Sequence, residues 1–207
     1  MFTGIVQTKL PISDIKTTHG IAQLTLAFPD EFIIGLKIGA SVAINGTCLT
    51  VVSLEANNVS FDIVAGTLAQ TNLGDLQRHD SVNVERSLKF GDEIGGHILS
   101  GHIHSTAKIE AILREQANTR MVIGYQAACN AYIFDKGFIG VNGASLTIAS
   151  VDHDQYCFAL NLIPETLAKT TLGEAKVGDR VNIELDSQTV AIVDTVERVL
   201  AQREMAD

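Results

Sequence analysis

The chain has 207 residues, of which 46% are hydrophobic and 19% charged, a balance that predicts a soluble globular protein rather than a disordered chain. Its formal net charge of −9 comes without a basic stripe, which disfavours nucleic-acid binding. No apolar run approaches the roughly 20 residues needed to cross a bilayer, the first residues lack signal-peptide features, and the three cysteines lack C-x-x-C spacing. A cytoplasmic protein without a membrane segment, zinc site or disulfide framework is therefore expected.

The first half of the chain has the pattern of β structure. Short apolar runs at residues 41–44, 49–52 and 59–62 are separated by turn residues and predict strands. Asn45-Gly46 lies between two of these runs, and both residues tolerate the positive φ of a tight hairpin turn. Six or so short strands in about 90 residues predict a small closed barrel, which leaves no exposed sheet edge.

Other segments of this half predict helices and a connection. Short helices are expected at residues 29–34 and 67–74, and by repetition at 166–173. Residues 89–96, rich in glycine and charge, are expected to form the hinge that follows the first half.

The second half of the chain repeats the first. Residues 45–51 match residues 142–148 at an offset of 97, whereas residues 67–74 match 166–173, and residues 80–85 match 179–184, both at an offset of 99. Residues 2–5 likewise fall opposite residues 99–102. The change in offset predicts a two-residue insertion in the second copy, between Thr147 and Thr166. The sequence is therefore a tandem duplication.

After the second copy the pattern becomes helical. Residues 188–205 place Val193, Val196 and Leu200 on one stripe. A single helix of about five turns cannot bury such a stripe alone, so it either packs back on a barrel or assembles with copies of itself, and the short heptad pattern slightly favours self-assembly. The predicted fold is all-β, with two tandem six-stranded barrels at residues 1–97 and 98–187 and a C-terminal α-helix for oligomerisation at 188–207.

A duplicated chain offers two similar pockets. Cys48 and Thr50 in one copy, and Ser145 and Thr147 in the other, stand two apart on predicted strands and so share one face. Threonine and serine also simply favour strands, but recurrence at one register favours ligand contact. Such sparse polar lining would suit a flat heteroaromatic ligand with ring carbonyls and a polyol tail.

Several motifs together resemble the riboflavin synthases, from Met1 through about Val199. They are residues 1–6 (MFTGIV), the two N-G-x-[CS]-L-T-[VI] segments, residues 95–102 (GGHILSGH), residues 163–167 (IPETL) and residues 193–200 (VDTVERVL). The resemblance is especially near to the bacterial form.

The resemblance implies both architecture and activity. Each half would be a six-stranded Greek-key barrel, the C-terminal helix would drive a homotrimer, and each active site would lie between the N-barrel of one subunit and the C-barrel of its neighbour. Two molecules of 6,7-dimethyl-8-ribityllumazine would bind there face to face, and a four-carbon unit would pass between them to yield riboflavin and 5-amino-6-ribitylaminouracil. No metal, flavin or nicotinamide cofactor is implied, and an association with lumazine synthase stays open.

The resemblance also implies site residues. The candidates for catalysis are Phe2, Cys48, His102, Ser145 and Asp186. His102 is a plausible proton carrier because the reference pKa of histidine, about 6.5, allows both forms near neutrality, whereas Cys48 also suits a small buried hydrophobe. Lys136 and Asp186 also suit the solvated surface. The substrate-binding candidates are Gly4, Ile5, Val6, Cys48, Leu49, Thr50, Asp62, Ile63, Val64, Ala65, Gly66, Thr67, Gly101, His102, Ile103, Lys136, Ser145, Leu146, Thr147, Asn161, Leu162, Ile163, Pro164, Glu165 and Thr166.

Two features weigh on this interpretation. His102 and His104, with His97 nearby, could ligate zinc from a strand, but a clear third ligand and a carboxylate partner are missing, so no metal is expected. Gly66 stands where the first copy of the family normally carries glutamate, as Glu165 does in the second. That loss is compatible with the main rival, a non-catalytic lumazine- or flavin-binding protein. A purely structural trimer would explain the C-terminal helix but not the twin polar registers.

Overall fold

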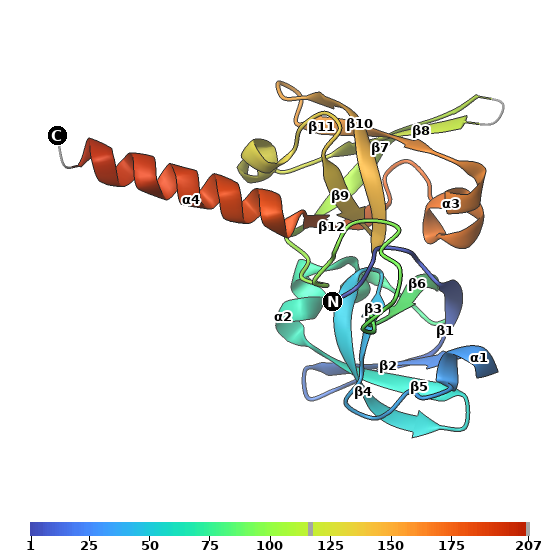
Figure 1. Cartoon of the computed structure of the whole chain (residues 1–207). Coiled ribbons are helices and arrows are strands. Elements are labelled where there is room, and N and C mark those ends of the chain that lie inside the picture. Colours follow the sequence, from blue (N-terminus) through green and yellow to red (C-terminus); the bar gives the residue numbers. More distant parts are fainter. Residues whose placement is uncertain (116–117, 206–207) are drawn as a thin grey trace.

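The computed structural model describes residues 1–115 and 118–205 and contains two closed six-stranded barrels, as predicted. Figure 1 shows the N-barrel and the C-barrel in contact, with one long helix projecting from them. The N-barrel consists of β1 (Thr8–Thr18), β2 (Ile21–Ala27), β3 (Ser41–Ile44), β4 (Thr47–Glu55), β5 (Asn58–Val64) and β6 (Ser81–Arg86). The C-barrel consists of β7 (Ser105–Glu115), β8 (Asn118–Gly124), β9 (Phe138–Val141), β10 (Ala144–Asp152), β11 (Cys157–Leu162) and β12 (Arg180–Leu185).

The two barrels have the same topology. The strands of the first run β1-β2-β5-β4-β3-β6 around the barrel, and those of the second, read from β7, run β7-β8-β11-β10-β9-β12. The turn between β4 and β5 spans residues 56–57, whereas the turn between β10 and β11 spans residues 153–156. The two-residue insertion predicted from the change in offset therefore lies in this turn.

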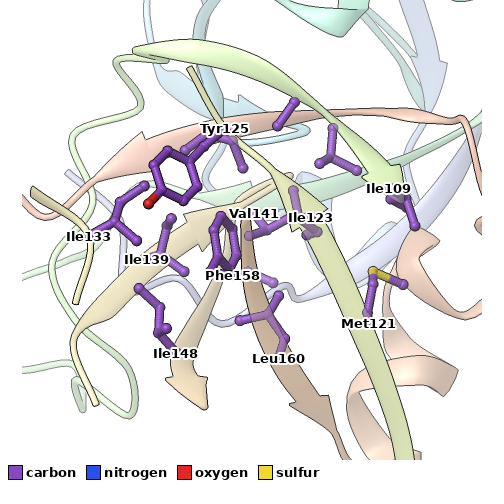
Figure 2. Close-up of a cluster of buried hydrophobic side chains, with 14 of the residues drawn as sticks. Ile109, Met121, Ile123, Tyr125, Ile133, Ile139, Val141, Ile148, Phe158 and Leu160 are labelled. Atoms are coloured by element: carbon purple, nitrogen blue, oxygen red, sulfur yellow. The ribbon is translucent and has the colours of Figure 1, made fainter. Parts of the chain in front are cut away.

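Alternating burial along the strands fills each barrel with its own core. Along β2, Ala22, Leu24 and Leu26 are buried and their neighbours face outward, as the two-residue period of a strand requires. Figure 2 shows the core of the C-barrel, where Phe158 and Leu160 of β11 meet Ile123 of β8. Burying a side chain of this size contributes roughly 1.5–3 kcal/mol.

The two Asn-Gly hairpin turns meet at the contact between the barrels. Asn45 and Gly46 have φ values of 45° and 80°, and Asn142 and Gly143 have 46° and 80°, the positive φ predicted for primed turns. A Cβ on Gly46 would lie 2.6 Å from the backbone nitrogen of Gly143. Glycine is therefore required both by the turn and by the approach of the other barrel.

Asparagine side chains join the barrels around these turns. Asn83 Nδ2 donates to the carbonyl oxygen of Asn142 at 2.8 Å, and Asn182 Nδ2 donates to that of Asn45 at 2.8 Å. All four residues are buried, with at most 5% exposed. Because buried polar groups that lose a partner are costly, this reciprocal network fixes how the barrels sit together.

The short helices differ in their bounds from the prediction. Helix α1 (Asp30–Ile33) lies within the predicted segment, but α2 (Ala65–Gln70) and α3 (Pro164–Lys169) begin two residues before the predicted threonines. Each then breaks into a 3₁₀ turn, η1 (Asn72–Asp75) or η3 (Thr171–Gly173). The extended backbone of Thr71 and Thr170 ends the α-helices, and the hydroxyls of these two threonines cap the following turns.

The C-terminal helix α4 (Ser187–Glu204) extends away from both barrels (Figure 1). Asp186 caps its first turn by accepting the Thr189 N–H at 3.0 Å, and Tyr132, in the 3₁₀ helix η2 (Ala127–Tyr132), donates to Asp194 Oδ1 at 2.6 Å. Val190 in the first turn packs against the C-barrel core, but Ile192 is 64% exposed and Leu200 52%, so the apolar stripe of α4 is not covered by a barrel. Residues 206–207 of the predicted helix lie outside the described residues. In the described part of the chain, no helix is long and apolar enough to span a membrane.

Candidate functional site

The segment that leads into each barrel lies on the other barrel. Phe2 and Leu99 pair in an antiparallel bridge, with N···O distances of 2.8 and 3.0 Å. Beyond this crossing, the carbonyl oxygen of Gly4 accepts the Ser145 N–H at 2.8 Å. Likewise, the carbonyl oxygen of Gly101 accepts the Cys48 N–H at 2.9 Å. Each candidate site therefore combines a strand of one copy with the leading segment of the other.

Glycine is required at both crossing points. Gly4 and Gly101 have φ values of 73° and 81°, a region that favours glycine. A Cβ on Gly4 would lie 2.9 Å from Ser145 N, and one on Gly101 would lie 2.8 Å from Cys48 N. A larger residue at either position would push the leading segment away from the polar face of the strand.

Two buried glutamates anchor the leading segments. Glu85 accepts the Thr3 N–H at 2.6 Å and the Gly4 N–H at 3.1 Å, and Glu184 accepts the Ser100 N–H at 2.6 Å and the Gly101 N–H at 3.1 Å. Burial raises the pKa of Glu85, against the lowering effect of its hydrogen bonds to Thr3 and Gly4. The two carboxylates therefore fix the backbone directly before Ile5 and His102.

A cavity of about 610 Å³ lies on the C-barrel, at the contact between Gly4 and Ser145. This volume is within the range typical of small-molecule sites. Eight of the predicted substrate-binding residues line it: Gly4, Ile5, Val6, Ser145, Leu146, Ile163, Glu165 and Thr166. Thr147 is exposed on the same face of β10 as Ser145, but it is not part of the lining.

The corresponding face of the N-barrel carries Cys48 and Thr50 on β4. Cys48 is partly buried and Thr50 is exposed, whereas Leu49 between them faces the barrel core. Gln70 Nε2, from α2, donates to the carbonyl oxygen of Ile103 at 2.9 Å and ties the helix to the leading segment. The predicted residues Asp62, Val64, Ala65 and Gly66 are exposed on β5 and α2, as are Asn161, Ile163, Pro164 and Glu165 on β11 and α3.

Some predicted site residues lie away from the polar face. Leu49, Ile63 and Leu162 are at most 5% exposed and belong to the barrel cores, because successive strand residues alternate between the two faces. Phe2 is 1% exposed and packs with Ala43, Leu99 and Cys48. Its place is beneath the polar face, where it supports Cys48.

Lys136 and Asp186 stand at the ends of elements. Lys136 is exposed before β9 with a φ of 67°, at the position where the N-barrel has Gly39 with a φ of 87°. Because seven of the described non-glycine residues have a positive φ, this backbone conformation alone assigns Lys136 no role. Asp186 caps α4 and lines a smaller cavity of about 250 Å³ beside His97.

The three histidines considered for a metal site have separate surroundings. His102 is exposed, the Nδ1 of His104 accepts the Leu185 N–H at 3.2 Å, and His97 is buried beside Ser145. Within residues 1–115 and 118–205, no group of three His, Cys, Asp or Glu side chains is placed to hold a metal ion.

The sequence interpretation missed several residues at the two sites. Gln7, Phe32, Lys169 and Thr170 also line the C-barrel cavity, and Phe32 belongs to α1 of the N-barrel. Gln70 at the N-barrel face was missed as well. Comparing the two copies could have identified Gln70 and Lys169, because they occupy the same position in the aligned helices. Phe32 could not be found in this way, because it reaches the cavity only through the packing of the barrels.

Comparisons with known proteins agree with this geometry. The lumazine binding domain model matches twice, at residues 3–87 and 100–186. LumP complexed with 6,7-dimethyl-8-(1'-D-ribityl) lumazine superposes with a TM-score of 0.80 at 26% identity, over 89% of this chain and 99% of that one. LumP complexed with riboflavin gives 0.81 at 29% identity, with the same coverage. The fold and paired sites thus define a duplicated lumazine-binding barrel protein.

The sequence relatives narrow this class to one family. Riboflavin synthase of Escherichia coli (strain K12) is 51% identical over 207 residues, covering 100% of this chain and 96% of the relative. Riboflavin synthase of Chlamydia pneumoniae is 43% identical, covering 97% of this chain and 98% of the relative. The chain belongs to the riboflavin synthase family.

Proposed function

We propose that the protein is an enzyme that joins two molecules of 6,7-dimethyl-8-ribityllumazine, transferring a four-carbon unit from one to the other and releasing riboflavin and 5-amino-6-ribitylaminouracil. The observation that carries this proposal is the twin arrangement of Cys48 with Gly101 and Ser145 with Gly4. A reaction between two copies of one ligand needs a place for each copy, and the repeat provides two places with the same backbone contact. Full-length identity to riboflavin synthases gives independent support.

The chemistry asks the protein mainly for positioning and proton handling. Stacking two rings in one site replaces a collision by a local reaction, an effect worth up to roughly 7–11 kcal/mol in well-aligned systems. A base must remove a proton from the 7-methyl group, whose carbanion is delocalised into the ring, and an acid must assist the departing amine. His102 is suited to proton transfer because its side chain is exposed and it directly follows Gly101, whose carbonyl oxygen accepts the Cys48 N–H.

We place the reaction between subunits of a homotrimer, with the N-barrel face of one subunit opposite the C-barrel cavity of the next. Exposed apolar residues on α4, which include Ile192, Val196, Val199 and Leu200, support assembly through this helix. Three free thiols agree with a reducing, cytoplasmic setting.

A non-catalytic ligand-binding protein is the second candidate. The LumP structures contain riboflavin, flavin mononucleotide or ribityllumazine on a similar fold, and Gly66 removes from the N-barrel a carboxylate that Glu165 provides in the C-barrel. The presence of both polar pairs, Cys48 with Thr50 and Ser145 with Thr147, favours the enzyme, because a protein that binds one chromophore would need only one pair.

Incubation of the purified protein with 6,7-dimethyl-8-ribityllumazine and a chelator distinguishes the two candidates. We expect riboflavin to appear without added cofactor or metal, as followed by absorbance. Tight binding with a fluorescence change but without riboflavin would instead identify a binding protein.

A further inference from the structure

The hydroxyl of Ser145 is held by a residue outside the aligned repeat blocks. The backbone N–H of His97 donates to Ser145 Oγ at 3.0 Å, and the Nδ1 atom of the same residue lies 2.6 Å from that oxygen. Gly96 permits this approach, since a Cβ there would lie 2.6 Å from the Cβ of Ser145. Ser145 also lines the 610 Å³ cavity of the C-barrel, so His97 reaches that cavity only through Ser145.

The His97 ring is fixed in place. It is 8% exposed and stacks on Phe138, with ring centroids 5.2 Å apart and an interplanar angle of 17°. Its Nε2 atom is buried and has no hydrogen-bond partner among the described residues. A buried, stacked imidazole whose Nδ1 lies on the Ser145 hydroxyl holds that hydroxyl in one orientation.

Burial and the charge of Asp186 act in opposite directions on the pKa of His97. Burial lowers the pKa of His97, so the ring is neutral near pH 7, and the charge of Asp186 opposes this shift. Asp186 is the charged residue lining the smaller cavity beside His97. A neutral imidazole can accept a hydrogen bond from the Ser145 hydroxyl at Nδ1, and the tautomer that does so carries its proton on Nε2.

The N-barrel has a different arrangement at the equivalent position. Cys48 takes the place of Ser145, and its packing partners are Phe2, Ala43 and Leu99 rather than an imidazole. Both halves therefore share the backbone contact to the leading segment. Only the C-barrel has a hydroxyl, that of Ser145, which is hydrogen-bonded to a histidine.

We propose that His97 is a positioning residue that acts through Ser145. When His97 Nδ1 accepts a hydrogen bond from the Ser145 hydroxyl and the His97 backbone N–H donates to Ser145 Oγ, one lone pair of that oxygen stays free for the cavity. This oxygen then accepts a hydrogen bond from a ring N–H or a ribityl hydroxyl of the lumazine in the C-barrel. The inference rests on the proposed function, and it makes the two halves unequal in how they hold their ligand.

Two substitutions separate positioning from packing. His97→Phe keeps the stacked ring but removes the acceptor, and we expect kcat to fall about 10- to 100-fold, the range caused by small misplacements in a site. His97→Asn loses the ring but puts an amide oxygen near the position of Nδ1, and we expect it to recover activity to within about threefold of the wild type. His153→Phe, at an exposed histidine in the 153–156 turn, is the matched control.

A double-mutant cycle with Ser145→Ala gives the decisive result. If His97 acts through Ser145, His97→Phe has no further effect on kcat in the Ser145→Ala background. Multiplying effects, or equal losses in the Phe and Asn variants, would overturn the inference. If the wild type binds ribityllumazine but forms no riboflavin, the proposed function fails. The role of His97 is then tested by measuring the dissociation constant of ribityllumazine for the same single and double variants. An unchanged dissociation constant in His97→Phe would then contradict it.

Discussion

His102 and Cys48 stand at the same crossing on the N-barrel, and their substitution tests whether that crossing takes part in the chemistry. Because His102 is exposed and Cys48 is only partly buried, we expect His102→Ala and Cys48→Ala to lower turnover at least tenfold while thermal melting stays close to that of the wild type. Steady-state rates and circular dichroism check this expectation. Wild-type rates in folded variants would remove both residues from the catalytic set.

Replacing Gly66 by glutamate should add a ligand contact to the N-barrel. A Cβ on Gly66 meets nothing within 4 Å, so glutamate fits there without strain. We expect Gly66→Glu to bind ribityllumazine several-fold more tightly, since a carboxylate can accept hydrogen bonds from ribityl hydroxyls. Fluorescence titration measures this, with Gly66→Gln as the control for added bulk. Equal or weaker binding would show that the missing carboxylate does not limit the N-barrel.

His97 also gives the protein a pH-dependent stability. Because burial holds its folded-state pKa below the ordinary value of 6.5, the unfolded chain takes up the proton more readily than the folded one. The stabilisation is present above about pH 6.5 and is lost as the pH falls below it. Melting temperatures measured from pH 7.5 to pH 5 should decline less steeply for His97→Phe than for the wild type. Parallel curves would contradict this assignment.

At the scale of elements, the glutamate anchors link the barrel strands to the site. Glu184 accepts hydrogen bonds from Ser100 and Gly101, and its side chain lies in a buried position. Glu184→Ala should destabilise the protein by about 1–3 kcal/mol, because buried N–H donors lose their acceptor, and should slow turnover by displacing His102. Urea unfolding and rates measure both effects. A variant as stable and active as Glu55→Ala, a control at an exposed glutamate at the end of β4, would refute the anchoring role.

The elements differ in how far the sequence predicts them. The barrels, the hairpin turns and the insertion at residues 153–156 follow from local periodicity and from comparing the copies. The predicted starts of α2 and α3 fall two residues late, because Thr67 and Thr166 lie inside the first turn and the helices begin after Val64 and Ile163. The crossing of the leading segments was not predicted, since the contact of Gly4 with Ser145 spans most of the chain. The pairing of His97 with Ser145 was also not predicted, because the two residues are 48 positions apart and His97 lies outside the aligned blocks.

At the scale of the whole molecule, α4 carries the prediction about assembly. Its exposed apolar side chains have no cover within the described residues of one chain. Full-length Val196→Glu/Leu200→Glu should therefore give monomers with intact barrels and activity reduced at least tenfold. Sedimentation, circular dichroism and rates test this together. A fully active monomer would defeat a site shared between subunits.

We propose that the duplicated barrels hold two copies of one ligand so that one can react with the other. The most direct measurement is the stoichiometry of conversion, with ribityllumazine consumed and riboflavin formed quantified in the same reaction by chromatography. We predict two lumazines consumed for each riboflavin formed, with one 5-amino-6-ribitylaminouracil released. A ratio of one to one, or loss of lumazine without riboflavin, would contradict this account.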